Sequence, residues 1–350
     1  MSVSDFEMVE AWGQVLSLSG IAAGQTVTIL TSSDTHPQTL RTAIVAARAK
    51  GAIVNRLDLL PVNGGTSLSR DPLAYVGTTP LTGNKAALAM LKASDLVLDL
   101  MTLLFSAEQH EILSAGGRIL LAVEPPEILL RMVPTEEDRR RVLAASRVLR
   151  AARQMRVTSA AGTDVTFALG EYPILEEYGF CERAGRWDHW PSGFLATWSN
   201  EGSAQGTIVL DRGDILLPQK SYVREPVTFT IRDGYVTDIA GGLDADLLRG
   251  YMESFGDPEV YAISHVGWGL QKRAHWSVLG LYDREATIGM DSRACAGNFL
   301  WSTGPNNEAG GTRDTACHID IPMRNCTVML DGDAVVRDGE LVNDGLGNAA

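Results

Sequence analysis

The sequence predicts a two-part chain, in which an α/β half with a mostly parallel sheet precedes an α+β half rich in antiparallel sheet. Helix-like and strand-like patterns alternate over roughly the first 150 residues, which is typical of a parallel sheet covered on both faces. From about Met155 the chain changes to short β-prone runs joined by Asp-Gly turns. We therefore expect two domains, α/β at 1–154 and α+β at 155–342, with a flexible tail at 343–350.

The elements of the first half follow from the spacing of apolar residues. Apolar side chains that recur every three or four residues predict helices, and continuous aliphatic runs predict buried strands. In chain order we expect a helix at 5–19, a strand at 26–32, a helix at 36–51, a strand at 52–60, a helix at 84–94, a strand at 95–101, a helix at 106–116, a strand at 117–124 and a helix beginning near Pro134. In this interpretation His36 stands at a helix start and His110 lies on an exposed helix face.

Asp-Gly dipeptides punctuate the second half of the chain. Such pairs favour the tight turns of antiparallel hairpins when β-prone runs lie on both sides. The expected strand segments are 163–169, 206–217, 226–242 and 326–342, with one helix near 244–256.

The charge and composition of the chain disfavour some classes of binding partner. With 43 acidic and 30 basic residues the net charge is −13, which opposes binding to nucleic acid or to an anionic membrane. The arginines between 139 and 156 follow an acidic helix start, so we expect a solvated helix face there. No apolar run reaches the ~18 residues of a membrane span. The four cysteines show no C-x-x-C spacing and no secretion signal is apparent, so we expect a reduced, cytoplasmic protein.

Common cofactor and nucleophile motifs are missing from the sequence. There is no G-x-G-x-x-G after the first strand and no G-x-x-x-x-G-K-[ST], so the α/β half is not identified as a nucleotide domain. There is also no G-x-S-x-G, and a serine hydrolase therefore has no support.

The stretch "TACHIDIPMRN" contains a candidate metal-binding pair. Residues i and i+2 of a strand share a face, so His318 and Asp320 would present an imidazole and a carboxylate side by side. His265 ends the β-prone run "EVYAIS" before a Gly-rich turn and could supply a third ligand. Two histidines and one carboxylate are the ligand set of non-haem Fe(II) oxygenases. A hydrogen-bonded pair on a strand surface stays open as the alternative.

Two further stretches hold candidate site residues. In "GRWDHWPSGF" the tryptophans Trp187 and Trp190 flank His189, which could transfer protons to a planar substrate or belong to an aromatic cluster that closes a domain interface. The acidic residues of "LGEYPILEEYGF" most simply form an exposed turn, with Glu177 held in reserve as a polar site contact.

Long segments of the chain resemble one enzyme family. They are "GRILLAVEPPEILLRM", "PTEEDRRRVLAA", "GRWDHWPSGF", "DPEVYAISHVGWGLQ", "GNFLWSTGPN" and "CHIDIPMRNC". They are similar to segments of bacterial 2,5-dihydroxypyridine 5,6-dioxygenases, which act in the breakdown of nicotinic acid and related pyridines. The resemblance implies a fold like that of metal-dependent aminopeptidases of the leucyl aminopeptidase type. It also implies an Fe(II) enzyme that opens a hydroxypyridine with O2 to give N-formylmaleamate, and a homo-oligomer.

The resemblance also assigns roles to individual residues. It implies that His265, His318 and Asp320 are the iron ligands, that His189 is the acid/base, and that Ser302 contacts the ring. Leu104 and Phe105 fall at substrate-binding positions.

Phe105 departs from the family pattern, because a family member carries a histidine thought to act as a base at its position. Phenylalanine can pack on a ring but cannot accept a proton. His189, His110 or a water could take over that role, the substrate could be a related hydroxypyridine, or the activity could be reduced. A metal-dependent hydrolase, which the implied fold would allow, and a non-catalytic binding protein are retained as further alternatives. A two-zinc hydrolase usually needs additional bridging carboxylates, whereas this histidine-rich set fits a single ion better.

Overall fold

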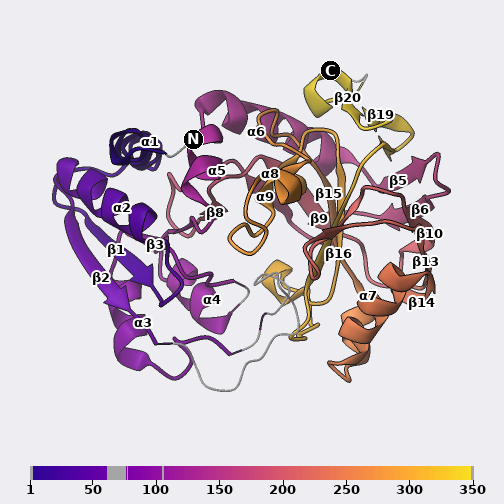
Figure 1. The fold of residues 1–350 in the computed structure, drawn as a ribbon, viewed down its shortest axis with the longest axis horizontal. Helices are drawn as coiled ribbons and strands as arrows, with labels where there is room; N and C mark the ends of the chain where they lie inside the picture. Colours follow the sequence, from indigo (N-terminus) through magenta and orange to yellow (C-terminus); the bar gives the residue numbers. More distant parts are fainter. Residues whose placement is uncertain (1–2, 61–75, 77, 105, 348–350) are drawn as a thin grey trace. The chain divides into compact units, whose positions relative to one another are not determined.

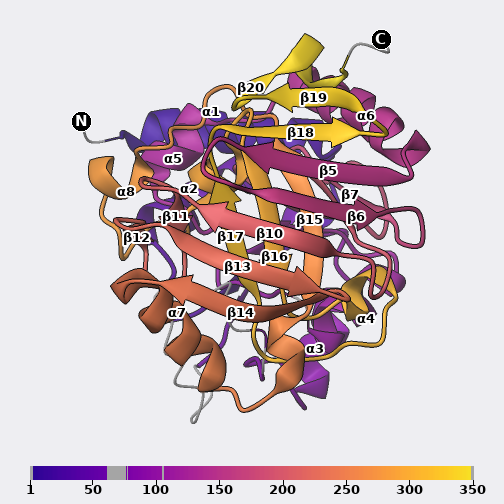
Figure 2. The same cartoon turned by 90° about the vertical axis from the view of Figure 1, so that its right-hand side faces the viewer.

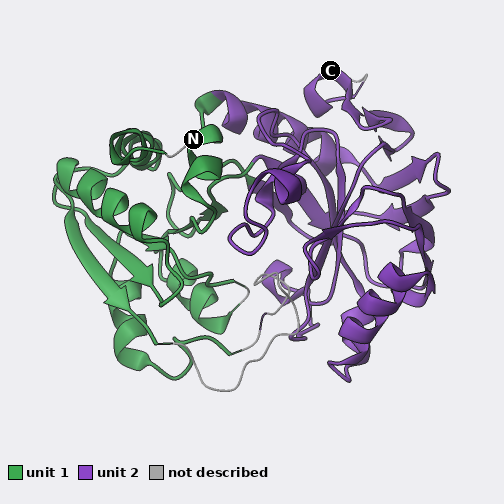
Figure 3. Ribbon diagram, in the orientation of Figure 1, with its two compact units in different colours: residues 1–66, 77–136, 177–192 green, residues 67–76, 137–176, 193–350 purple. Residues whose placement is uncertain are grey.

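The computed structural model describes residues 3–60, 76, 78–104 and 106–347 (Figure 1). These residues form two compact units (Figure 3). Unit 1 holds the described residues of 1–66, 77–136 and 177–192, and unit 2 holds those of 67–76, 137–176 and 193–350. Each unit has its own sheets, and each is described separately below.

Unit 1 alternates helices and strands, as the sequence predicts. Its elements are α1 (Asp5–Leu18), β1 (Thr26–Thr31), α2 (Pro37–Ala49), β2 (Ile53–Asp58), α3 (Lys85–Lys92), β3 (Leu96–Asp99), α4 (Ala107–Ser114), β4 (Ile119–Leu121), α5 (Pro126–Arg131) and β8 (Trp187–His189). His36 is the residue that precedes α2, and His110 is exposed on α4, so both placements are confirmed. Among the described residues, no helix has the length and apolar character needed to cross a bilayer.

The strands of unit 1 form a parallel sheet in the order β2-β1-β3-β4-β8. Alternate side chains of a strand point to opposite faces, and here they enter two separate cores. One core joins α1 and α2 to Val27 and Ile29, and the other joins α3 and α4 to Leu30 and Val97. The strand order reverses between β1 and β3, and sheets of this kind bind ligands beside the carboxyl ends of their strands.

The two units do not divide at the predicted boundary between residues 154 and 155, and strand β8 is one reason. Residues 177–192 belong to unit 1 although they follow strands of unit 2, because β8 pairs in parallel with β4 and places His189 opposite Leu121. Helix α6 (Glu136–Ala151) is grouped with unit 2 from its second residue on. Local periodicity cannot reveal that a sheet receives its last strand from a distant part of the chain.

Unit 2 is dominated by antiparallel sheet, as expected. Its strands are β5 (Gln154–Ser159), β6 (Asp164–Ala168), β7 (Ile174–Glu177), β9 (Phe194–Trp198), β10 (Gln205–Leu210), β11 (Ile215–Leu216), β12 (Ser221–Tyr222), β13 (Val227–Arg232), β14 (Tyr235–Gly241), β15 (Ile263–Gly269), β16 (Phe299–Thr303), β17 (Ile319–Met323), β18 (Cys326–Leu330), β19 (Asp333–Arg337) and β20 (Glu340–Leu341). Its helices besides α6 are α7 (Leu243–Glu253), α8 (Val278–Leu281) and α9 (Met290–Ala294), with 3-10 turns η2 (Pro258–Tyr261), η3 (Asn307–Ala309) and η4 (Val342–Gly345).

Asp-Gly turns close three of the hairpins, as the sequence predicts. In each pair both residues have positive φ, the conformation that a two-residue type I′ turn requires. The pairs are Asp233-Gly234, Asp331-Gly332 and Asp338-Gly339. Of the predicted tail 343–350, the first residues lie in η4, and residues 348–350 lie outside the described part of the chain.

Two sheets of unit 2 pack face to face (Figure 2). The larger has the order β14-β13-β10-β6-β5-β18-β19-β20, and the smaller has the order β17-β16-β15-β9-β7. Phe229 of β13 meets Trp301 of β16 edge to face at 5.0 Å between ring centroids, and Phe167 of β6 lies 6.3 Å from Phe299. Because side chains alternate along β16, its neighbour Ser302 points to the opposite face of the smaller sheet.

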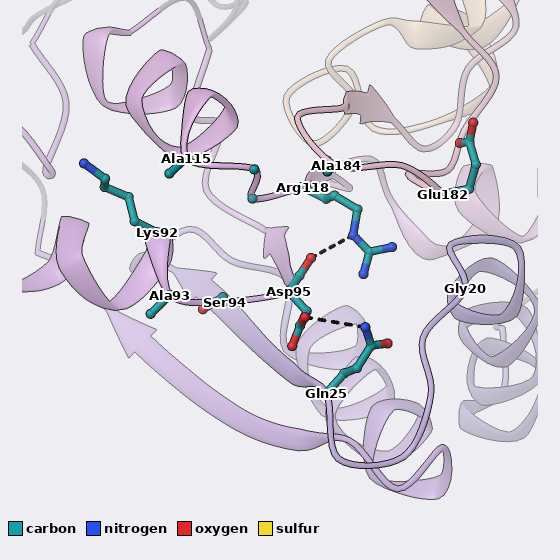
Figure 4. A pocket seen from close by; sticks show the side chains of 12 residues that line it. Gly20, Gln25, Lys92, Ala93, Ser94, Asp95, Ala115, Arg118, Glu182 and Ala184 are labelled. Carbon is teal, nitrogen blue, oxygen red and sulfur yellow. Dashed lines mark hydrogen bonds between the residues drawn. The ribbon is translucent and has the colours of Figure 1, made fainter.

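A pocket of about 500 Å³ lies at the amino end of the parallel sheet of unit 1 (Figure 4). Polar groups of this pocket form hydrogen bonds within the protein. Arg118 Nε donates to the carbonyl oxygen of Asp95 at 2.8 Å, and the Asp95 carboxylate accepts from the Thr26 N–H at 2.8 Å. It contains none of the predicted site residues, and it lies away from the strand ends where such sheets bind ligands.

The core of unit 1 rests on a pair of buried tryptophans. Trp12 of α1 and Trp190 meet edge to face at 4.7 Å between ring centroids, and Trp190 Nε1 donates to the carbonyl oxygens of Leu129 and Met132. We predict that Trp12→Ala lowers the free energy of unfolding by roughly 3–5 kcal/mol, because it leaves a large cavity.

The measurement is urea unfolding followed by circular dichroism. The matched control is Phe6→Ala on the same helix, whose side chain is 71% exposed and whose loss should change stability by less than about 0.5 kcal/mol. Similar losses in the two variants would contradict the tryptophan pair as a core contact.

Candidate metal centre

Three residues from segments about fifty positions apart converge in unit 2. His265 lies on β15, His318 directly precedes β17, and Asp320 lies within β17. The Nε2 atom of His265 is 3.0 Å, and that of His318 3.2 Å, from Oδ1 of Asp320. All three side chains are buried. Among the described residues this is the one group of three or more His, Cys, Asp or Glu side chains placed to share a metal ion.

A β-bulge positions His265. The pairing of β15 with β16 shifts register between Ile263 and Val266, so Ser264 and His265 together stand opposite Ser302. The backbone N–H of His265 donates to Oγ of Ser302 at 3.0 Å. A side-chain hydroxyl thus takes the place of a backbone carbonyl at the irregular point of the ladder, which is a position where bulges commonly re-aim a side chain.

Ser302 and Trp198 surround the triad on the same sheet. Ser302 lies directly opposite Asp320 in the pairing of β16 with β17, and its side chain is fully buried. Trp198 lies opposite His265 in the pairing of β9 with β15, and their rings meet edge to face at 5.9 Å. The ring-contact role of Ser302 stays a prediction, and the structure adds a backbone contact to His265.

Burial and nearby charge set the protonation of the triad. Burial lowers the pKa of His265, which favours the neutral imidazole. Burial by itself would raise the pKa of Asp320, but His318 and Arg293 outweigh it and hold that pKa well below its usual value. The neutral imidazole of His265 and the ionised carboxylate of Asp320 are the forms in which these two side chains bind metal.

The arrangement fits a metal ion better than a set of hydrogen bonds. Oδ1 of Asp320 is buried and has no hydrogen-bond partner among the described residues, although both imidazole Nε2 atoms lie within 3.2 Å. Two donor atoms that bind one ion at about 2.1 Å and at right angles lie about 3.0 Å apart. A cation between the three atoms would satisfy the buried oxygen, so the residues fit a single ion such as Fe(II).

His189 belongs to unit 1, where it ends β8 at the carboxyl edge of the parallel sheet. The preceding Asp188 is fully buried and accepts the backbone N–H groups of Tyr178, Gly179 and His189 at 2.7–3.1 Å. The guanidinium of Arg186 pairs with the same carboxylate at 2.5 Å. These contacts fix the backbone from which the His189 side chain projects. Its ring lies 6.2 Å from that of Trp187, whereas Trp190 is a core residue.

Leu104 lies on a loop at the same edge of unit 1. The loop follows β3, whose last residue Asp99 accepts the backbone N–H groups of Met101 at 2.9 Å and Leu103 at 2.5 Å. Thr102 between them has φ 70°, a conformation that is unfavourable for a β-branched residue. Asp99 therefore holds the loop that carries the buried Leu104. The other predicted substrate contact, Phe105, lies outside the described residues.

The exposed turn predicted for the three glutamates holds for Glu171 alone. Glu176 and Glu177 end strand β7, and Glu177 is buried and accepts a hydrogen bond from Ser192 Oγ at 2.9 Å. The prediction was wrong for these two residues because the polar run around them forms strand β7. This strand joins the smaller sheet beside β9, which sequence pattern alone does not indicate.

Sequence reasoning missed two charged residues that support these sites. Arg293 of α9 donates from Nε to Oδ2 of Asp320 at 2.6 Å, and Asp99 supports the loop of Leu104. Neither belongs to a recognisable motif. The one available signal was a charged residue within an otherwise apolar run, as in "DLVLDLM" for Asp99.

Comparison with known proteins places the chain in a family. A sequence model described as 2,5-dihydroxypyridine 5,6-dioxygenase (NicX) matches residues 7–343. The chain belongs to this family. A curated 2,5-dihydroxypyridine 5,6-dioxygenase of Pseudomonas putida KT2440 is 53% identical over 342 residues, which cover 98% of each chain. The solved structure of 2,5-dihydroxypyridine dioxygenase from Pseudomonas putida KT2440 has a TM-score of 0.95 at 53% identity, over 97% of this chain and 98% of that one.

A distant structure shares the fold of this family. AmpT from Thermus thermophilus has a TM-score of 0.65 at 12% identity, over 97% of this chain and 100% of that chain. At this identity the likeness shows the fold alone, and it confirms the predicted aminopeptidase-like α/β and α+β architecture.

Asp99 gives a testable pH dependence of stability. Burial raises the pKa of Asp99 to about 6, against the opposing effect of the N–H groups of Met101, Leu103 and Thr102. A folded-state pKa above the unfolded value means that protonated Asp99 contributes stability at low pH, and that this contribution is lost as the pH rises through about 6.

We predict that Asp99→Asn becomes more stable relative to the wild type as the pH rises from 4 to 7, by on the order of 3 kcal/mol. Urea unfolding of both proteins across this range measures the difference. A difference that does not change with pH would contradict a buried, titrating carboxyl group.

Proposed function

We propose that this chain is a ring-cleaving dioxygenase that converts 2,5-dihydroxypyridine and O2 to N-formylmaleamate, with Fe(II) bound by His265, His318 and Asp320. The observation that carries the metal assignment is the convergence of two imidazole Nε2 atoms on one buried carboxylate oxygen. The reaction is supported by membership of the family and by the 53% identity to a relative of that name.

The donor set suits iron in an oxygenase. Two histidines and one carboxylate bind one side of the ion and leave adjacent positions open for two further ligands. Bound there, Fe(II) would supply electron density for O2 and a Lewis-acidic position for the substrate's hydroxyl oxygen. The neutral imidazole of His265 and the ionised Asp320 would leave a net positive charge at the centre, which favours the substrate as an oxyanion.

The protein's own groups would bind and protonate the substrate. His189 would take the proton of the 5-hydroxyl group and return it to an oxygen of the opened ring, since imidazole exchanges protons near neutral pH. Leu104 would contact the substrate, and Ser302 would orient the heterocycle. The acid/base role of His189 rests on the family resemblance. The side chain of Phe105 cannot accept a proton and supplies no second base.

The partners of the reaction are small molecules: a hydroxypyridine and O2. Homo-oligomerisation and a cytoplasmic location stay predictions from the sequence.

Loss of a ligand should abolish metal binding. We predict that wild-type protein reconstituted anaerobically retains one iron per chain, and that His318→Ala and Asp320→Ala lose both this iron and substrate-dependent O2 uptake. Iron is measured by elemental analysis after desalting, and folding by circular dichroism.

His275→Ala is the matched control, since this histidine of unit 2 is exposed and the variant should keep iron and activity. Full activity with bound metal in either ligand variant would refute the assignment. Two zinc ions per chain with peptide hydrolysis would support a metal-dependent hydrolase instead.

Removal of His189 should separate proton transfer from metal binding. We predict that His189→Ala retains iron but lowers kcat for 2,5-dihydroxypyridine by about 10²–10⁴-fold, the usual contribution of general acid-base catalysis. Iron content and O2 uptake are measured on the same preparation.

His110→Ala, which removes an exposed histidine of unit 1, should leave both quantities unchanged. Unchanged kcat in His189→Ala would rule out the proposed acid/base role.

A further inference from the structure

We propose that Arg293 is a positioning residue that restricts Asp320 to metal binding through one oxygen. Its guanidinium occupies the position beside the other oxygen, where a second metal ion would lie if Asp320 bridged two ions. This inference rests on the proposed metal centre, and it concerns how that centre is limited to one ion. The argument uses the contacts of Asp320, the anchoring of Arg293 and the geometry of two-metal sites.

The two oxygens of Asp320 have different partners. Oδ1 faces the Nε2 atoms of His265 and His318 at 3.0 and 3.2 Å. Oδ2 accepts a hydrogen bond from Nε of Arg293 at 2.6 Å. Both side chains of this ion pair are nearly inaccessible, at 3% exposure for Arg293 and 7% for Asp320. The lone pairs of Oδ2 therefore point at a fixed positive charge.

The guanidinium is held from its other side as well. Nη1 of Arg293 donates to the carbonyl oxygen of Ile288. The next residue, Gly289, has φ 83°, and a Cβ atom there would come within 2.6 Å of a methyl carbon of Leu217. A glycine is thus required at the turn that aims the Ile288 carbonyl at the guanidinium.

Asn298 ties this segment to the sheet that carries His265. Its Nδ2 donates to the carbonyl oxygens of Ser292 at 2.6 Å and Arg293 at 3.0 Å. Its Oδ1 accepts the backbone N–H of Gly269, the last residue of β15, at 2.6 Å. Helix α9 is therefore fixed relative to the strand of one ligand while its arginine holds the carboxylate of another.

This arrangement distinguishes a one-metal from a two-metal site. Co-catalytic metal pairs lie about 3.5–4 Å apart and are commonly bridged by carboxylates that give one oxygen to each ion. In this chain the second oxygen of Asp320 is taken by a cation that cannot be deprotonated. A second metal ion would have to displace a buried guanidinium and would be repelled by its charge. We therefore infer that Arg293 makes the site mononuclear.

Infrared spectroscopy of the wild-type protein tests the inference directly. The apo chain, labelled with ¹³C at the aspartate carboxylates, is loaded with Zn²⁺, and the difference spectrum shows the carboxylate that binds. We expect the separation of the antisymmetric and symmetric stretching bands to widen relative to the apo carboxylate, in which Oδ2 has the same hydrogen bond, because one-oxygen ligation makes the two C–O bonds less alike. A separation that narrows on loading, as chelation gives, would overturn the inference even though metal is bound.

Cobalt substitution of variants tests the role of Arg293 itself. With Co²⁺ in excess, the wild type should bind one ion per chain with the EPR signal of an isolated ion. In Arg293→Met, Oδ2 is released, so we expect Asp320 to chelate, the coordination number to rise and the visible absorption of Co²⁺ to weaken. Arg293→Lys keeps a cation beside Oδ2 and should restore the wild-type band.

Arg186→Met is the matched control, since it removes an arginine from a buried ion pair with Asp188 in unit 1 and should leave the Co²⁺ band unchanged. A wild-type band in folded Arg293→Met, or two magnetically coupled ions in the wild type, would overturn the inference. If the wild type binds neither Zn²⁺ nor Co²⁺, the metal centre itself is wrong, and that outcome is distinct from a failure of Arg293.

Discussion

The candidate site depends on the burial of one carboxylate. A charged group taken out of water must be compensated by opposite charge and by hydrogen bonds. Asp320 obtains this compensation on Oδ2 from Arg293, and removing the arginine would leave a buried charge without its partner. Oδ1 lies within 3.2 Å of the Nε2 atoms of two histidines but stays buried without a hydrogen bond, and this is the position that a metal ion would fill.

Antiparallel strand pairing places the groups that surround Asp320. Strands β15, β16 and β17 are neighbours in one sheet, so residues distant in sequence lie side by side. Register places Ser302 opposite Asp320, and the bulge in β15 turns His265 so that its N–H meets the Ser302 hydroxyl. The packing of Phe299 and Trp301 against the larger sheet sets which face carries these groups. A one-residue slip would move every side chain to the other face.

In unit 1 the predicted residues are positioned by a parallel sheet instead of an antiparallel one. The carboxyl ends of its strands meet at one edge, and the predicted residues of this unit that the structure describes lie there. His189 ends β8, and Leu104 lies on the loop that Asp99 stabilises after β3. Buried carboxylates support both: Asp188 accepts three backbone N–H groups beside His189, and Asp99 accepts those of the loop. Backbone segments that leave a sheet need such acceptors because they have no strand partner.

The sequence by itself determined the local elements and the chemistry of the candidate residues. Apolar spacing predicted helices such as α1 and strands such as β1, and Asp-Gly pairs predicted the hairpin turns, because these depend on neighbours along the chain. Strand alternation placed His318 beside Asp320 for the same reason. The pattern around His189 left proton transfer and an aromatic cluster open, and resemblance to a family favoured the acid/base role. The same resemblance alone assigned Ser302.

Only the tertiary structure decided what lies around these residues. It brought His265 to the pair, assigned β8 to the first sheet, buried Glu177 and placed Arg293 on Oδ2 of Asp320. Each of these contacts joins segments that local periodicity does not relate, since pairing between distant strands and the packing of α9 depend on the whole chain. The charge that compensates a buried carboxylate can come from any segment that the fold brings near.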